Sequence, residues 1–178
     1  MTPDERRLAF ADAFAAQGRS DWEVFKHLAG LSRPSFPSCH RLHYLQMATE
    51  KIAKAYRIRD TGADVDKLAK GHAGFEEFVN SFFRCKTIRD EYTGKDAVLQ
   101  TLQKNATTLA KQIEKLAPAI DNFVSPENAE YPWERDGKVH RPCKFEYPNL
   151  SMLTQPAGRA VMNLIERAFN DFERLNIN

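Results

Sequence analysis

The feature that most constrains this chain is a run of apolar residues that recur at alternating steps of three and four. The run comprises Leu99, Leu102, Ala106, Leu109, Ile113, Leu116, Ile120 and Phe123. This is the a/d spacing of helices that pack lengthwise against other helices, as in coiled coils and left-handed bundles. It predicts one long helix. Because Pro118 has no backbone N–H, we expect a kink there, or a break followed by a restart.

A second apolar stripe comprises Leu42, Leu45, Thr49, Ile52 and Tyr56, again at helical spacing. Glu50 and Lys54 lie mostly on the other side of this helix, in the favourable i,i+4 order. The pattern predicts an amphipathic helix from about Cys39 to Arg59, ended near Gly62. We expect the two stripes to pack against each other as neighbouring helices of one core.

Further helices are predicted on both sides of these two. Residues 4–17 predict an Ala-rich first helix ended by Gly18, and Ser20 is a plausible N-cap for a second, short helix. Residues 72–84 carry a dense Phe-rich face and predict a core helix. A last helix begins near Pro156 and repeats the spacing of three and four.

The segment 125–150 has a different character, with three prolines and a cluster of aromatic residues. Its Asp136–Gly137 pair is a strong signal for a two-residue hairpin turn. We therefore predict an all-α fold, an up-down antiparallel bundle of about five to seven helices with a small β-hairpin or loop insertion near residues 125–150. Residues 1–178 form one domain in this prediction, with 1–19 as an N-terminal helical extension.

The bulk composition favours a soluble globular protein. The 178 residues are 42% hydrophobic and 28% charged, with a net charge of only +2, which neither indicates nor excludes nucleic-acid binding. No apolar run approaches the roughly 18 residues of a membrane span, and the N-terminus does not resemble a secretory signal. Three widely spaced cysteines favour reduced thiols over a disulfide framework. We expect a cytoplasmic protein without membrane contact.

Residues 48–55 have the sequence Ala-Thr-Glu-Lys-Ile-Ala-Lys-Ala. This segment resembles the second helix of the HEPN domains (higher-eukaryote and prokaryote nucleotide-binding), whose usual wording is Ala-Ala-Glu-Lys-x-x-Lys-Ala. A histidine after the following loop and a later Tyr-Pro pair occur in the order found in that family. The positions that carry the resemblance are Glu50, Lys51, Lys54, His72, Tyr131 and Pro132. The likeness in motif order covers roughly residues 20–175.

The resemblance implies a homodimer, and in some members a ribonuclease activity. Those members use an Arg, four to six intervening residues, and a His. The His moves the 2′-hydroxyl proton, and the Arg holds the scissile phosphate. This chain departs from the family before Tyr131, where Glu130 stands at the position of an Arg. That substitution places a negative charge where a phosphate ligand is expected.

Arg135 and His140 do have the required spacing, with four residues between them. In a tight hairpin, Trp133, Arg135, Lys138 and His140 share one face because side chains alternate along a strand. Such a patch can bind a phosphate and stack a base. The simpler alternative, which we favour, is a solvated loop whose Trp133 folds onto the bundle.

Two functional hypotheses follow. In the first, which we favour, the chain is a HEPN-like module that binds a protein, RNA or a nucleotide, is homodimeric, and belongs to a defence or toxin–antitoxin-like system. In the second, it is a metal-independent endoribonuclease that uses Arg135 and His140. We expect no cofactor. We also expect no metal site, because the potential ligands Cys39, His40 and His43 lack a fourth partner at a suitable spacing.

Overall fold

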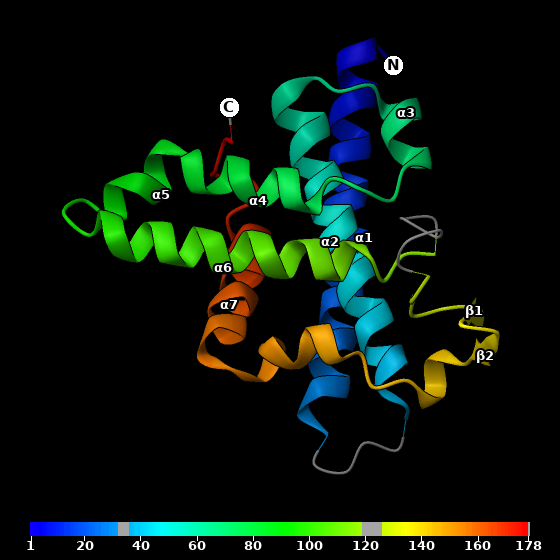
Figure 1. Cartoon of the computed structure of the whole chain (residues 1–178). Helices are drawn as coiled ribbons and strands as arrows, with labels where there is room; N and C mark the ends of the chain where they lie inside the picture. Colours follow the sequence, from blue (N-terminus) through cyan, green and yellow to red (C-terminus); the bar gives the residue numbers. More distant parts are fainter. Residues whose placement is uncertain (32–35, 119–125, 178) are drawn as a thin grey trace.

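Two long helices pair along their length and form the centre of the molecule (Figure 1). The computed structural model describes residues 1–31, 36–118 and 126–177. Helix α1 spans Pro3–Gly30 and starts with a capping box between Thr2 and Glu5. Helix α2 spans Ser38–Thr61 and ends at a left-handed Gly62, as the sequence predicts.

The predicted helix end at Gly18 is wrong, because α1 continues through this residue to Gly30. Ser20 accordingly lies inside the helix and is not an N-cap. A Cβ atom on Gly18 would lie 3.0 Å from the Cβ of Lys51 and 3.1 Å from the ring of Phe169. Glycine at this position therefore permits a close approach of α1 to α2 and to the C-terminal helix, and it does not end α1.

The stripe from Leu42 to Tyr56 is buried, as predicted. Helix α6 spans Asp96–Glu114 and buries the middle of the other stripe, against α4, α7 and α2. It ends four residues before Pro118, and residues 115–118 form turns. The predicted continuation through Ile120 and Phe123 lies outside the described residues.

The short helices complete the helical part of the fold. Helix α3, Val65–Lys70, lies in a segment where no helix was predicted, and Asp64 caps its N-terminus. Helices α4, Phe75–Arg84, and α5, Lys86–Glu91, follow. Figure 1 shows α4 and α6 side by side, as a pair that crosses the α1–α2 pair.

The hairpin predicted around Asp136 is present. Strands β1, Trp133–Arg135, and β2, Lys138–His140, pair antiparallel. Asp136 and Gly137 have φ angles of 52° and 67°, as a two-residue turn of type I′ requires.

After the hairpin the chain returns to the bundle through two short 3-10 helices. These are η1, Pro142–Lys144, and η2, Pro148–Thr154, which contacts α6 and α7. Helix α7, Pro156–Asn170, begins where the sequence predicts. The described residues thus confirm an all-α bundle with a small hairpin insertion. None of the helices in residues 1–31, 36–118 and 126–177 combines the length and apolar character needed to cross a membrane.

Candidate functional site

The hairpin places the four predicted patch residues on one face. Trp133 is paired with His140, and Arg135 with Lys138, so all four side chains project from the same side of the two strands. At its base this face is turned toward the bundle. Trp133 is 7% exposed, whereas Val139 on the opposite face is 71% exposed.

Trp133 and His140 belong to an aromatic cluster. Their rings stack with centroids 5.8 Å apart and planes inclined by 13°. Phe145 meets the indole edge-on at 5.1 Å. Trp133 therefore folds onto the protein, as the simpler interpretation of this segment expects, and His140 is half-buried beside it. Neither ring presents the open stacking surface of a solvent-exposed patch.

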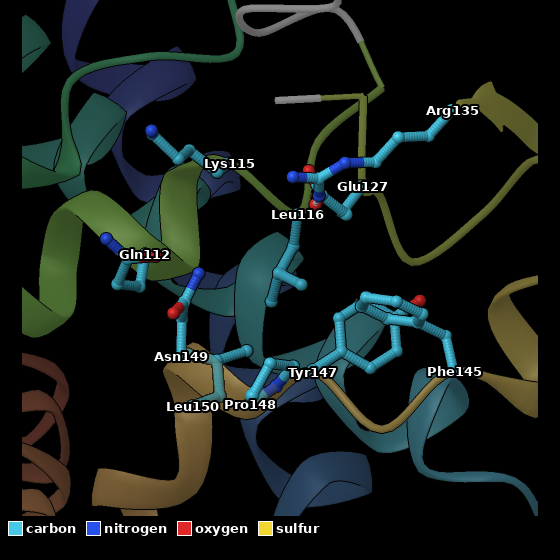
Figure 2. Close-up of a pocket in the computed structure, with 10 residues that line it drawn as sticks. All are labelled: Gln112, Lys115, Leu116, Glu127, Arg135, Phe145, Tyr147, Pro148, Asn149 and Leu150. Carbon is cyan, nitrogen blue, oxygen red and sulfur yellow. Dashed lines mark hydrogen bonds and ion pairs between the residues drawn. The ribbon is translucent and has the colours of Figure 1, made fainter. Parts of the chain in front are cut away.

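Arg135 and Lys138 lie nearer the turn and are exposed. The Arg135 guanidinium forms an ion pair with the carboxylate of Glu127. Figure 2 shows the Arg135 side chain extending from the hairpin to the mouth of a cavity, with Glu127 beside its head group. This cavity has a volume of about 340 Å³.

Among the described residues, the walls of the cavity come from three parts of the chain: the Glu127 loop with Arg135 of the hairpin, the end of α6, and η2 with the segment before it. The end of α6 and the following turn supply Gln112, Lys115 and Leu116; η2 and the approach to it supply Phe145, Tyr147, Pro148, Asn149 and Leu150. Figure 2 shows the Asn149 amide projecting toward the α6 side, and the Lys115 ammonium pointing away from Arg135. The cavity thus combines a cation at its mouth, aromatic rings and amide groups.

Asn128 fixes the loop that carries Glu127. Its side-chain oxygen accepts hydrogen bonds from the backbone N–H groups of Glu130 (2.9 Å) and Tyr131 (2.7 Å). Its backbone carbonyl accepts a hydrogen bond from the Tyr147 hydroxyl at 2.7 Å. Burial raises the pKa of Tyr147, and nearby Cys39 and Cys143 raise it further, so the phenol stays a neutral donor. This loop and the aromatic wall are therefore held together.

The HEPN-like residues of α2 form a separate, buried polar network. The Lys54 ammonium lies 2.6 Å from Glu50, which also accepts a hydrogen bond from Gln46 at 2.7 Å. His72 Nδ1 lies 3.2 Å from the second oxygen of Glu50, and Lys51 pairs with Asp21 of α1. None of these residues lines the cavity.

Charge pairing decides the ionisation of Glu50. Burial opposes ionisation of this carboxyl group, but the hydrogen bond and charge of Lys54, with the hydrogen bonds of Gln46 and His72, hold its pKa below the ordinary value. The Glu50 carboxyl group is therefore ionised at neutral pH. The pair of Glu50 and Lys54 ties α2 to the last turn of α3, where the Lys54 ammonium lies 3.5 Å from the Ala69 carbonyl oxygen. This arrangement is that of a structural network.

Glu130, which stands at the position of the family Arg, lies with Tyr131 and Pro132 just before the hairpin. Glu130 Oε1 is 3.4 Å from His43 Nδ1, so this carboxylate faces α2 and not Arg135. Tyr131 and Pro132 are exposed. Tyr131 has 60% of its surface exposed.

No protein-family model, curated protein or solved structure matches the chain. The HEPN resemblance therefore rests on the residues quoted above. Within residues 1–31, 36–118 and 126–177, no three His, Cys, Asp or Glu side chains form a group that could hold a metal ion. The three cysteines are free thiols, with Cys39 and Cys85 buried and Cys143 exposed.

Sequence reasoning identified Arg135 but missed the residues around it. These are Gln112, Glu127, Asn128, Tyr147 and Asn149. Only Asn128 had a local signal in the sequence. An Asn in a Pro-rich segment often forms a turn in which its side-chain oxygen accepts hydrogen bonds from the backbone N–H groups two and three residues later. The other four have no signal in the sequence, because segments distant in the chain bring them together.

Proposed function

We propose that the chain is a non-catalytic binding module, resembling HEPN domains, that binds RNA or a nucleotide beside its hairpin. The observation that carries this proposal is the position of Arg135 at the mouth of a cavity walled by aromatic and amide side chains. A guanidinium binds phosphate through two parallel hydrogen bonds, and aromatic faces stack bases without regard to sequence. The neighbouring Lys138 adds a second exposed cation on the same face.

The ribonuclease alternative has weaker support. Arg135 and His140 are on one face of the hairpin, as cleavage requires. However, the His140 imidazole is stacked on Trp133 and meets Phe145 edge-on. A general base must reach the hydroxyl proton that it removes. The enclosed ring of His140 favours a packing role over proton transfer.

Arg135→Ala is expected to weaken binding of a fluorescein-labelled, mixed-sequence RNA by about tenfold or more, because a charged hydrogen bond contributes about 1.5–3 kcal/mol. Fluorescence anisotropy titration measures the change. Arg84→Ala is the matched control, since it removes an exposed arginine from the end of α4 and is expected to leave the affinity unchanged.

Equal affinities of the two variants would contradict binding at the hairpin. The same RNA samples, incubated with EDTA and separated on a denaturing gel, test the ribonuclease alternative. We expect intact RNA. Cleavage that persists in EDTA and is lost in both Arg135→Ala and His140→Ala would replace the binding proposal with the enzyme one.

The HEPN likeness also supports a homodimer and, with it, a role beside a protein partner in a defence or toxin–antitoxin-like system. The exposed Tyr131 and Val139 near the hairpin are available to such contacts. Static light scattering of the dilute protein is expected to give twice the mass of one chain. The mass of a single chain at every concentration would rule out the homodimer.

A further inference from the structure

We infer that the cavity beside Arg135 binds one phosphorylated nucleoside, either a free nucleoside monophosphate or the terminal nucleotide of an RNA strand. This inference rests on the proposed function and names the chemistry of its ligand. It concerns residues of the α6 end, the Glu127 loop and the segment 145–150, none of which carries the HEPN resemblance.

The size of the cavity limits its occupant. Its volume of about 340 Å³ is near the lower end of the range of about 300–1,000 Å³ found for small-molecule sites. That space suits one base with its sugar and phosphate, and it does not suit several consecutive nucleotides. A strand can place one such nucleotide in the cavity by its end.

The aromatic wall suits a flat ring. The rings of Phe145 and Tyr147 have centroids 4.9 Å apart and planes inclined by 88°. Tyr147 is 5% exposed and backs this wall, so the half-buried Phe145 supplies its accessible aromatic surface. A planar ring can stack on such a surface in an offset arrangement. Leu116 and Leu150 add apolar surface to the same cavity.

The amide groups suit the edge of a nucleobase. Gln112 on α6 and Asn149 on η2 both line the cavity, and each carries a carbonyl acceptor and an NH₂ donor. Figure 2 shows the Asn149 amide directed toward the α6 side, away from the hairpin. Paired donors and acceptors of this kind match the edges of heterocyclic bases. The hydrocarbon part of a simple alkyl phosphate has no groups that pair with them.

Glu127 forms an ion pair with the Arg135 guanidinium. A carboxylate presents two oxygens to an arginine in the same geometry as a phosphate does. In our proposal, the ligand phosphate replaces Glu127 on Arg135, and the carboxylate competes with the ligand. Removal of the Glu127 charge therefore strengthens binding of the nucleotide. If Glu127 had a purely structural role, its removal would weaken nucleotide binding or leave it unchanged.

Isothermal titration calorimetry with AMP, UMP, adenosine and inorganic phosphate tests the site. We expect both monophosphates to bind more tightly than adenosine or phosphate alone. Glu127→Gln is expected to tighten monophosphate binding by up to about fivefold, the range of an exposed ion pair. Asn149→Ala is expected to weaken it by about threefold to tenfold. Asn163→Ala, an exposed residue of α7 beside a different cavity, is the control without effect.

Ten-nucleotide RNAs with a 5′-phosphate, a 3′-phosphate or no terminal phosphate separate the two sources. If one phosphorylated RNA binds more tightly than AMP and UMP, the ligand is the end of a strand. If the phosphorylated RNAs bind no more tightly than AMP and UMP, the ligand is the free nucleotide. If RNA binds through Arg135 but the monophosphates do not bind, and Glu127→Gln and Asn149→Ala have no effect, the inference fails and the proposed function stands. If neither class of probe binds the wild-type protein, both fail.

Discussion

Lys54→Met is expected to lower the free energy of unfolding by about 3 kcal/mol, because it leaves the carboxylate of Glu50 buried without its charged partner. The two residues are 3% and 7% exposed, and their charged atoms lie 2.6 Å apart. Methionine keeps the length of the side chain, so the change isolates the charge. Gln46 and His72 remain as hydrogen-bond partners of Glu50, but Gln46 carries no charge. Urea unfolding followed by circular dichroism measures the loss.

Lys86→Met is the matched control. Lys86 forms the same kind of i,i+4 pair with Asp90, also at 2.6 Å, but both side chains are exposed. We expect no measurable loss, since exposed pairs contribute little. The double variant Glu50→Leu/Lys54→Met is expected to recover most of the lost stability, because no unpaired charge then remains. Equal stabilities of Lys54→Met and Lys86→Met would show that the buried network does not stabilise the fold.

This network shows what the Glu-Lys-x-x-Lys pattern on α2 does in this chain. The sequence places Glu50 and Lys54 on the polar side of an amphipathic helix. The structure surrounds α2 so completely, with α1, α3, α4 and α6, that this polar side is buried as well. The pairing of the two residues follows from their spacing, but their burial does not. Burial depends on how many helices pack around α2, which periodicity within one helix does not reveal.

Local signals were sufficient for the hairpin and for most helices. Asp136 and Gly137 specify a turn by their own backbone preferences, and Gly62 ends α2 in the same way. Gly18 is also a glycine, but it does not end a helix. Glycine is needed there because Lys51 and Phe169 pack closely against it, and these residues are distant in the sequence and close only in the folded chain.

The cavity could not be predicted for a related reason. Arg135 was identifiable from charge and spacing, and the structure places it at the mouth of the site. The amides that line the same cavity, Gln112 and Asn149, are ordinary polar residues in the sequence. They become a site only because η2 contacts the end of α6. The position of η2 in turn depends on how it packs against α7.

Gly158→Ala is expected to lower the free energy of unfolding by about 3 kcal/mol, at the upper end of overpacking changes. Gly158 lies in the first turn of α7, against η2. A Cβ atom there would lie 2.1 Å from the carbonyl oxygen of Met152 and 2.6 Å from the Cα of Leu153. Both are backbone atoms, so no side-chain rotation relieves the contact, and η2 must shift. Thermal unfolding followed by circular dichroism measures the loss.

Gly30→Ala is the control, because a Cβ on Gly30 meets no atom within 4 Å. It is expected to leave stability unchanged or to raise it by up to about 1 kcal/mol, since alanine favours the helix. The Gly158 variant also has a functional consequence. Because η2 carries Asn149 and Leu150, a shift of η2 displaces one wall of the cavity, so AMP binding is expected to weaken together with stability. If Gly158→Ala has the stability of the wild-type protein, α7 and η2 do not pack as closely as described. The position of Asn149 in the wall of the cavity would then be unsupported.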